Sequence, residues 1–392
     1  MSNSWPMVKL GEVLRQRQHD IPVDAAISYQ FAGVYSFGRG VFRGQVRTGS
    51  QFAYQHLAQL RTGDFVYPKL MAWEGAFGIV PPECDGCFVS PEFPVFEPLS
   101  ARIVPEYLRF FFQIPQVWQE ISGGSIGTNV RRRRLYPDAF LKAEIPLPSV
   151  PEQRRIVARI EELAAQIDEA HALCRTAAEQ TVALTVAMAH RGDLDTNEKT
   201  TAGWKRARLW EVLQIVDDSH KVQTDRSYPN LGIYSFGRGL FHKPPIDGLA
   251  TSAVALRRVK SGQFIYSRLF AFEGAYGMVT DEFNGAYVSQ EYPTFECDPH
   301  RVRAEFLVAY FKSVQVWKDV ATGSKGLGNR RQRVQPAQVL GHELWLPPIS
   351  LQTHLADVQA KVDTLRSLQA ETAVELDALL PSILDRAFRG EL

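Results

Sequence analysis

Two runs of arginine residues follow glycine-rich stretches of the sequence. The run at 131–134 comes after SGGSIGTN at 122–129, and the run NRRQR at 329–333 comes after GSKGLG at 323–328. Backbone amides and guanidinium groups bind phosphate oxygens, and arginine also makes paired hydrogen bonds to guanine. Both runs therefore predict contacts with nucleic acid, and solvated surface charge is the alternative. The candidate residues are Asn129, Arg131, Arg132, Arg133, Arg134, Lys325, Asn329, Arg330, Arg331 and Arg333.

A second candidate is the motif YSFGRG, which occurs at 35–40 and again at 234–239. Glycine on both sides of the arginine permits a tight turn that presents Arg39 and Arg238 to solvent, whereas Phe37 is expected to pack inward. Lys69 and Arg268 lie in the related segments YPKL and YSRL. These four cations are predicted to contact nucleic acid, with a structural salt bridge as the competing interpretation for Lys69 and Arg268.

Other residues with reactive side chains carry less weight. Cys84 and Cys87 have the spacing of half a zinc site or a redox pair, but the related segment has phenylalanine and alanine at 283 and 286. Asp64, Lys69 and Glu74 could form a nuclease cluster, yet the related positions 263, 268 and 273 hold Gln, Arg and Glu. The sequence contains no amino-methyltransferase motif, glycine-rich cofactor loop or P-loop. The chain is therefore predicted to be non-catalytic, with no metal site.

These correspondences follow one constant offset of 199 residues, which maps Gly33 onto Gly232. The same offset maps Trp5 onto Trp204 and the segment EGAFG at 74–78 onto EGAYG at 273–277. It requires no insertion between residues 5 and 148. The sequence therefore contains two copies of one unit of about 200 residues.

Composition limits the possible classes of protein. The 392 residues include 44 Lys and Arg against 43 Asp and Glu, so a nucleic-acid surface must be a local cluster of charge. No apolar run approaches the roughly 18 to 20 residues of a membrane span, and the N-terminus shows no secretory signal. Four cysteines form no disulfide framework. We expect a cytoplasmic protein without membrane contact.

Each copy begins with a globular part. Short runs rich in Val, Phe and Tyr lie between Gly and Pro residues, which is typical of mixed β structure. The dipeptides at 85–86 (Asp-Gly) and 284–285 (Asn-Gly) favour positive φ, and they predict a hairpin in each copy. An amphipathic helix is predicted over about 104–120, with a counterpart over about 303–320.

Each copy ends in a long helix. Apolar or small residues recur at spacings of 4 and 3 from Ile156 to Met188, through Leu184, and a more polar seam on the second helix includes Leu365 and Leu379. Such helices need partners, so the two are predicted to pack antiparallel and to hold the globular parts apart about an approximate twofold axis. Pro381 is expected to kink or interrupt the second helix.

With this organisation the sequence resembles the specificity subunits of type I restriction-modification systems. The main motif is IPLPSVPEQRRIV at 145–157, which leads into the first long helix. Further matches are TGDFV at 62–66 and the helix ends RGDL at 191–194 and RGEL at 389–392. The second copy departs from the pattern, with LQT at 351–353 in place of PEQ and Gly-Gln at 262–263 in place of Gly-Asp. The resemblance covers essentially the whole chain.

The resemblance implies an α+β architecture, in which two pseudo-twofold-related α/β target recognition domains are separated by two long antiparallel coiled-coil helices. The predicted boundaries are 1–148 for the first recognition domain, 149–192 for the first helix, 193–203 for a linker, 204–347 for the second recognition domain and 348–392 for the second helix.

It also implies a non-catalytic subunit that binds double-stranded DNA and scaffolds two copies of an adenine methyltransferase subunit, joined by motor-nuclease subunits for restriction. No cofactor is expected on this chain, whereas S-adenosylmethionine, and ATP with Mg²⁺ in the restriction complex, are expected on the partner subunits. One alternative is a recognition scaffold of another phage-defence or DNA-modification system. The other is a coiled-coil adaptor that grips proteins.

Shared loops predict that the two copies read related half-sites. A twofold arrangement presents these half-sites on opposite strands, as a gapped, imperfect inverted repeat with centres about one helical turn apart. The copies differ most between 43–60 and 242–259. The half-sites are therefore predicted to be related but not identical.

Overall fold

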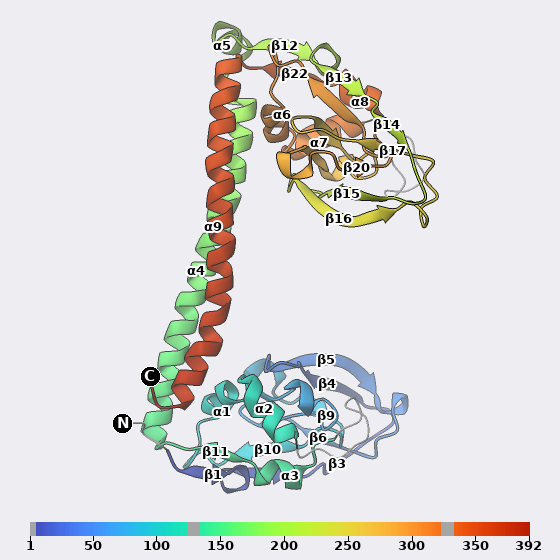
Figure 1. Cartoon of the computed structure of the whole chain (residues 1–392). Coiled ribbons are helices and arrows are strands. Elements are labelled where there is room, and N and C mark those ends of the chain that lie inside the picture. Colours follow the sequence, from blue (N-terminus) through green and yellow to red (C-terminus); the bar gives the residue numbers. More distant parts are fainter. Residues whose placement is uncertain (1–4, 124–133, 323–332) are drawn as a thin grey trace. The chain divides into compact units, whose positions relative to one another are not determined.

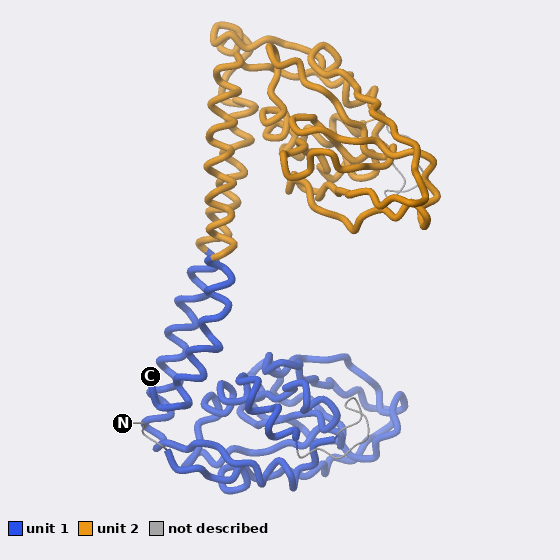
Figure 2. The backbone as a smooth tube through the Cα atoms, viewed as in Figure 1, with its two compact units in different colours: residues 1–172, 372–392 blue, residues 173–371 orange. Residues whose placement is uncertain are grey.

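The computed structural model describes residues 5–123, 134–322 and 333–392 (Figure 1). The chain forms two compact units, residues 1–172 with 372–392 and residues 173–371, which Figure 2 colours separately. Each unit contains one globular part together with a portion of each long helix.

Three sheets make up the globular part of the first unit. The strands are β1 (Met7–Lys9), β2 (Leu14–Arg17), β3 (Ile21–Pro22), β4 (Ser28–Val34), β5 (Val41–Thr48), β6 (His56–Gln59), β7 (Phe65–Val66), β8 (Gly78–Ile79), β9 (Phe88–Val89), β10 (Val95–Pro98) and β11 (Glu144–Pro146). Their orders are β3-β6-β9-β4-β5, β2-β10-β7-β8 and β1-β11. Strands β4 and β9 pair in parallel, and the other pairs are antiparallel.

The second unit repeats this topology strand for strand. Its strands are β12 (Lys205–Arg208), β13 (Leu213–Val216), β14 (Ser219–Lys221), β15 (Ser227–Ile233), β16 (Leu240–Asp247), β17 (Ala255–Arg258), β18 (Phe264–Tyr266), β19 (Tyr276–Met278), β20 (Tyr287–Val288), β21 (Thr294–Cys297) and β22 (Glu343–Leu346). Their orders are β14-β17-β20-β15-β16, β13-β21-β18-β19 and β12-β22, with β15 and β20 parallel. The predicted internal repeat is confirmed.

The core of the first globular part is largely aromatic. Phe65 stacks on Phe140 at a centroid distance of 5.4 Å, and Phe77 contacts Phe112 at 4.7 Å. These rings lie between the four-stranded sheet and the short helices, and they belong to one buried cluster. A smaller aliphatic cluster around Leu60 supports the five-stranded sheet. The first globular part therefore has two cores, an aromatic one under the four-stranded sheet and an aliphatic one under the five-stranded sheet.

Short helices replace the single amphipathic helix predicted in each copy. They are α1 (Pro105–Phe111), α2 (Pro115–Ser122) and α3 (Pro137–Lys142) in the first unit and α6 (Ala304–Tyr310), α7 (Val314–Ala321) and α8 (Pro336–Gly341) in the second. The break after α1 arises because Pro115 has no backbone N–H and begins a new helix. In the second copy, the indole N–H of Trp317 donates to the carbonyl of Phe311 and holds the equivalent turn.

The hairpins predicted at 85–86 and 284–285 are wrong. The turns form, with Gly86 at φ 74° and Gly285 at φ 82°. However, β8 before the first turn belongs to the four-stranded sheet, and β9 after it belongs to the five-stranded sheet. The dipeptide therefore sets the local φ angle, but the strands on either side pair with other partners.

The two long helices are α4 (Val150–His190) and α9 (Ile349–Phe388). In the first unit, Ile160 near the start of α4 shares a core cluster with Leu384 near the end of α9. In the second unit, Ala189 at the end of α4 shares a cluster with Leu355 near the start of α9. The helices are therefore antiparallel, as predicted.

The predicted heptad seams are only partly correct. Leu184 of the α4 seam is 54% exposed, whereas Thr185 and Ala189 are 1% exposed. A straight helix with 3.6 residues per turn drifts by about 20° per heptad from a 3.5-residue seam, so the buried stripe moves around the helix. Leu365 and Leu379 of the predicted α9 seam are also exposed, whereas Val362 and Leu384 of the same helix are buried.

The predicted interruption of α9 at Pro381 is also wrong, because the helix continues through this residue to Phe388. An internal proline removes one backbone hydrogen bond and costs about 3 kcal/mol. Packing offsets this cost: the Phe388 ring lies 4.9 Å from the Tyr107 ring and 5.2 Å from the Phe111 ring. The last turns of α9 thus belong to the core of the first unit.

A buried glutamine joins each long helix to its globular part. Gln153 accepts from the Val104 N–H at 2.8 Å and donates to the carbonyls of Arg102 and Pro148, both at 2.9 Å. Gln352 makes the equivalent three bonds, to Arg303, Arg301 and Pro347 at 2.8, 3.0 and 2.8 Å. The predicted correspondence of LQT with PEQ is therefore wrong by one residue. At the constant offset SLQ at 350–352 matches PEQ at 151–153, and both copies keep the glutamine.

The predicted linker contains a short helix, α5 (Thr196–Thr201), whose first turn is capped by Asp195. The Asp195 carboxylate accepts from the Glu198 N–H at 2.8 Å. None of the helices in the described part of the chain is long and apolar enough to cross a membrane. The mixture of helices and sheets around two long helices confirms the predicted α+β fold class.

Candidate nucleic-acid interface

The first YSFGRG motif forms a tight loop between β4 and β5. The Phe37 and Gly38 N–H groups donate to the carbonyls of Glu74 and Gly75, both at 2.8 Å. The Ser36 hydroxyl donates to the Glu74 carboxylate at 2.9 Å. The two short motifs that recur in the sequence, YSFGRG and EGAFG, therefore bind each other.

The second loop makes the same contacts. The N–H groups of Phe236 and Gly237 donate to Glu273 and Gly274 at 2.7 and 3.0 Å, and Ser235 donates to the Glu273 carboxylate at 3.0 Å. Because three hydrogen bonds anchor each loop to the same partner segment, the arginine that follows is presented from a fixed backbone.

An arginine and two aromatic rings stack on each loop. The Arg39 guanidinium lies 5.1 Å from the Tyr35 ring, which stacks on Phe42 at 4.2 Å and 27°. The Arg39 Nε also donates to the Ser36 carbonyl at 3.1 Å. These contacts hold an exposed cation over the Tyr35 ring, where it can reach a phosphate or a base edge.

The second unit repeats this stack with nearly identical geometry. Arg238 lies 4.9 Å from the Tyr234 ring, which stacks on Phe241 at 4.2 Å and 28°. The Arg238 Nε donates to the Ser235 carbonyl at 3.0 Å. The two predicted arginines therefore occupy equivalent, exposed positions.

The prediction that Phe37 packs inward is wrong. Its side chain is 62% exposed, and Phe236 in the second unit is 64% exposed. Both residues have a φ of 65°. This left-handed conformation, required by the turn, directs the ring outward, where its edge approaches Trp118 at 6.5 Å.

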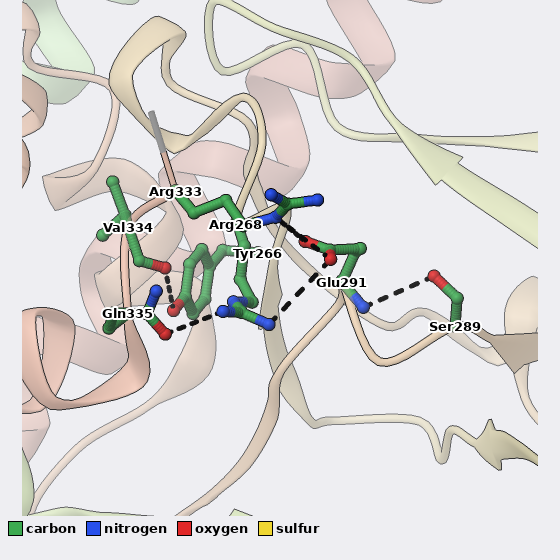
Figure 3. Close-up of polar contacts among 7 residues, drawn as sticks. All are labelled: Tyr266, Arg268, Ser289, Glu291, Arg333, Val334 and Gln335. Atoms are coloured by element: carbon green, nitrogen blue, oxygen red, sulfur yellow. Dashed lines mark hydrogen bonds and ion pairs between the residues drawn. The ribbon is translucent and has the colours of Figure 1, made fainter. Parts of the chain in front are cut away.

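A cationic cluster in the second unit surrounds Glu291 (Figure 3). The Arg333 Nε lies 3.2 Å from the Glu291 carboxylate, and the Arg268 guanidinium lies 4.0 Å from it. Arg268 also donates to the Gln335 side chain at 2.7 Å, and its carbonyl accepts from the Val334 N–H at 3.0 Å. The cluster therefore joins the segment 333–335 to Arg268 and Glu291.

The first unit has a related cluster, in which Arg134 pairs with Glu92 and Lys69 does not. The Arg134 Nε lies 3.3 Å from the Glu92 carboxylate, and the Lys69 carbonyl accepts from the Leu135 N–H at 2.9 Å. The Lys69 ammonium donates to the Pro91 carbonyl at 2.7 Å instead of pairing with Glu92. Such exposed ion pairs contribute less than about 1 kcal/mol, so the cations can exchange a carboxylate for a phosphate at small cost.

The structure places six of the predicted residues in two kinds of group that recur in both units. Arg39 and Arg238 belong to the two stacks, and Lys69, Arg134, Arg268 and Arg333 belong to the clusters at Glu92 and Glu291. The other eight lie outside the described residues, namely Asn129, Arg131, Arg132, Arg133, Lys325, Asn329, Arg330 and Arg331.

The cysteine pair and Asp64 have structural environments. Cys84 and Cys87 are buried in the small aliphatic cluster, where burial raises the pKa of Cys84 to about 11. The Asp64 carboxylate accepts from the Arg61 N–H at 2.9 Å, and the Gln263 side chain accepts from the Lys260 N–H at 2.8 Å. The change from aspartate to glutamine between copies therefore preserves one turn contact.

Sequence reasoning missed Phe42 and Glu92 with their partners Phe241 and Glu291. The stack and the cationic cluster depend on these residues, and both pairs follow the offset of 199. A systematic comparison of the copies would have identified them, because aromatic and acidic residues recur there beside the predicted cations.

Known structures share this fold. The HsdS subunit from Thermoanaerobacter tengcongensis aligns over 100% of this chain and 98% of its own, with 21% identity and a TM-score of 0.58. A chain from a structural study of complex assembly and conformational transition of the type I R-M system aligns over 100% and 99%, with 20% identity and a TM-score of 0.67. Scans against protein-family models and curated proteins return no match.

Proposed function

We propose that the chain is the DNA specificity subunit of a type I restriction-modification enzyme. The observation that carries this proposal is the recurrence, at equivalent positions of both units, of an arginine stack and of an arginine cluster around a glutamate. The shared fold with type I subunits supports it.

Double-stranded DNA suits the geometry of these sites. A chain with a net charge of +1 places cations at matched positions of both units, as a bipartite target requires. Glu92 holds Arg134 and Glu291 holds Arg268 and Arg333 without DNA, and phosphates would replace these carboxylates on binding. The two units read related half-sites of a gapped, near-palindromic sequence.

The long helices scaffold the catalytic partners. Each carries large apolar side chains that are more than 50% exposed, which favours the docking of further subunits. These side chains are Leu173, Leu184, Leu365, Leu368 and Val374. The partners are two methyltransferase subunits that carry S-adenosylmethionine, and restriction subunits that use ATP and Mg²⁺. The chain itself is non-catalytic and binds no cofactor.

Salt-dependent DNA binding tests the proposal. The purified full-length chain should bind double-stranded DNA and lose orders of magnitude in affinity between 50 and 200 mM salt, as expected for about six or more phosphate contacts. The variant R39A/R238A should show weaker binding and a shallower salt slope. Weak binding that is independent of salt would favour the protein-binding adaptor instead.

A further inference from the structure

A cavity of about 420 Å³ opens on the five-stranded sheet of the first unit. Phe31, Phe42 and Phe93 supply apolar walls, and Gly44 and Arg47 lie beside them on the cavity surface. The Phe42 ring is also the one on which Tyr35 stacks, and Tyr35 in turn lies under the Arg39 guanidinium. One wall of the cavity therefore belongs to the arginine stack of the candidate interface.

In the second unit a lysine crosses the equivalent position. The offset of 199 maps Gly44 onto Lys243 and Phe93 onto Tyr292. The Lys243 ammonium donates to the Tyr292 hydroxyl at 3.0 Å and lies 5.9 Å from the centre of the Phe241 ring. A Cβ atom added to Gly232 would lie 2.7 Å from the Lys243 Cε atom, which shows that the lysine stem lies over this glycine.

The two arrangements offer different chemistry to a base edge. At this position the first unit presents no side chain at Gly44 and the aromatic carbon of Phe42 and Phe93, which suit the 5-methyl group of thymine, while Gln45, Arg47 and Ser90 supply polar groups elsewhere on the lining. The second unit presents an ammonium group with three N–H donors, of which the Tyr292 hydroxyl accepts one. The remaining donors suit the O6 and N7 acceptors of guanine.

We infer that the position shared by Gly44 and Lys243 determines one base in each half-site, thymine for the first unit and guanine for the second. The inference rests on the proposed function. It assigns the difference between the two half-sites to the presence of a lysine side chain at 243 and its absence at 44. Gly44 and Lys243 lie on β5 and β16, where the two copies diverge, beside arginine loops that are identical.

Selection from a randomised double-stranded DNA library tests this inference with the full-length chain. The variant G44K/F93Y transfers the lysine and its hydroxyl partner to the first unit, and K243G/Y292F removes them from the second. The tight contact at Gly44, where an added Cβ would lie 3.2 Å from the Phe31 carbonyl oxygen, is accommodated at the equivalent Lys243. The control V46K adds a lysine on the same strand, at a 60% exposed residue outside the cavity.

The wild-type motif should contain thymine at one position of one half-site and guanine at the equivalent position of the other. G44K/F93Y should change the thymine preference to guanine by about tenfold and leave the other half unchanged. K243G/Y292F should abolish the guanine preference, and V46K should alter neither. K243G/Y292F only removes side-chain atoms. If G44K/F93Y does not fold, the result for K243G/Y292F is therefore sufficient to test the inference.

Two results separate the inference from the proposed function. A bipartite wild-type motif whose base preferences are unmoved by both variants, or weakened uniformly across sequences, would overturn the inference alone. A wild-type chain that enriches no bipartite motif would overturn the proposed function and the inference with it.

Discussion

The two sheet faces share a fixed loop and differ along one edge strand. The loops at 35–40 and 234–239 are identical in all six positions, and their anchoring bonds agree within about 0.2 Å. The neighbouring strands β5 and β16 keep only phenylalanine, at Phe42 and Phe241, among eight positions. Divergence is therefore concentrated beside the arginine stack, as expected if the stack positions DNA and the edge strand reads its sequence.

The largest effect on stability is expected at the buried glutamines, whose three hydrogen bonds match between the two units. Q153A and Q352A each leave three polar partners without a bond, so each should lower the free energy of unfolding of its unit by about 3 kcal/mol. Thermal unfolding would measure the loss of stability, and hydrogen exchange would show in which unit it occurs. Q180A, at an exposed position on α4, is the control. Unequal losses would show that the two helix junctions are not equivalent.

A smaller effect is expected at the two arginine stacks. R39A and R238A should each weaken DNA binding by about tenfold and reduce the salt slope by about 1, because each removes one phosphate contact. Fluorescence anisotropy at several salt concentrations measures both quantities. Lysine substitutions should restore the slope but only part of the affinity, since the stack on tyrosine is lost. If one substitution strongly lowered the affinity for DNA and the other did not, the two stacks would not be equivalent in DNA binding.

Acid should affect the second unit through two histidines. Burial lowers the pKa of His190 and of His342 below the ordinary 6.5, and both rings contact Tyr310, with N–O distances of 3.0 and 2.9 Å. The unfolded chain therefore binds protons at a higher pH than the folded chain, and stability falls as the pH drops below about 6.5. The residue equivalent to His342 in the first unit is Ala143.

Thermal unfolding between pH 7.5 and 5.5 checks this difference. The variant H190Q/H342Q should lose less stability on acidification than the wild type, whereas H300Q, at an exposed position, should behave as the wild type does. The first unit also holds a partly buried histidine, His19, whose pKa is lowered by burial. An unchanged pH dependence in H190Q/H342Q would contradict the assignment to the second unit.

The smallest effect is expected at the two glutamates. E92Q and E291Q remove a carboxylate that competes with phosphate for nearby cations, so each should tighten DNA binding a few-fold at low salt, and less at high salt. E291Q should have the larger effect, since Glu291 lies near both Arg268 and Arg333, whereas Lys69 donates to a backbone carbonyl. Weaker binding in both variants would instead assign the glutamates to positioning the arginines.

Much of the architecture could be predicted because each residue of one copy could be compared with its equivalent in the other. The offset of 199 identified both copies, and apolar periodicity predicted α4 to end at about residue 190, where it does. Strand partners could not be predicted, because the turn at Gly86 fixes only local backbone angles. Helix faces were predicted less well along α4, since small drifts per turn accumulate and bury Thr185 instead of Leu184.

The candidate site was predicted in part. The sequence identified Arg39 and Arg238 because glycines flank them, but it misjudged Phe37, whose outward direction depends on a φ of 65°. It also could not show that Glu74 holds the loop or that Lys69 donates to a carbonyl, since both contacts join segments more than 20 residues apart. Such contacts depend on the sheet order, which the sequence did not determine.

Whether this chain specifies a DNA target is decided by a map of methylated adenines in a host that expresses it together with a type I methyltransferase subunit. We expect a gapped, nearly palindromic motif that disappears when the gene for this chain is deleted. An unchanged methylation map, obtained with an active methyltransferase and a folded chain, would contradict the claim that the chain specifies the DNA target.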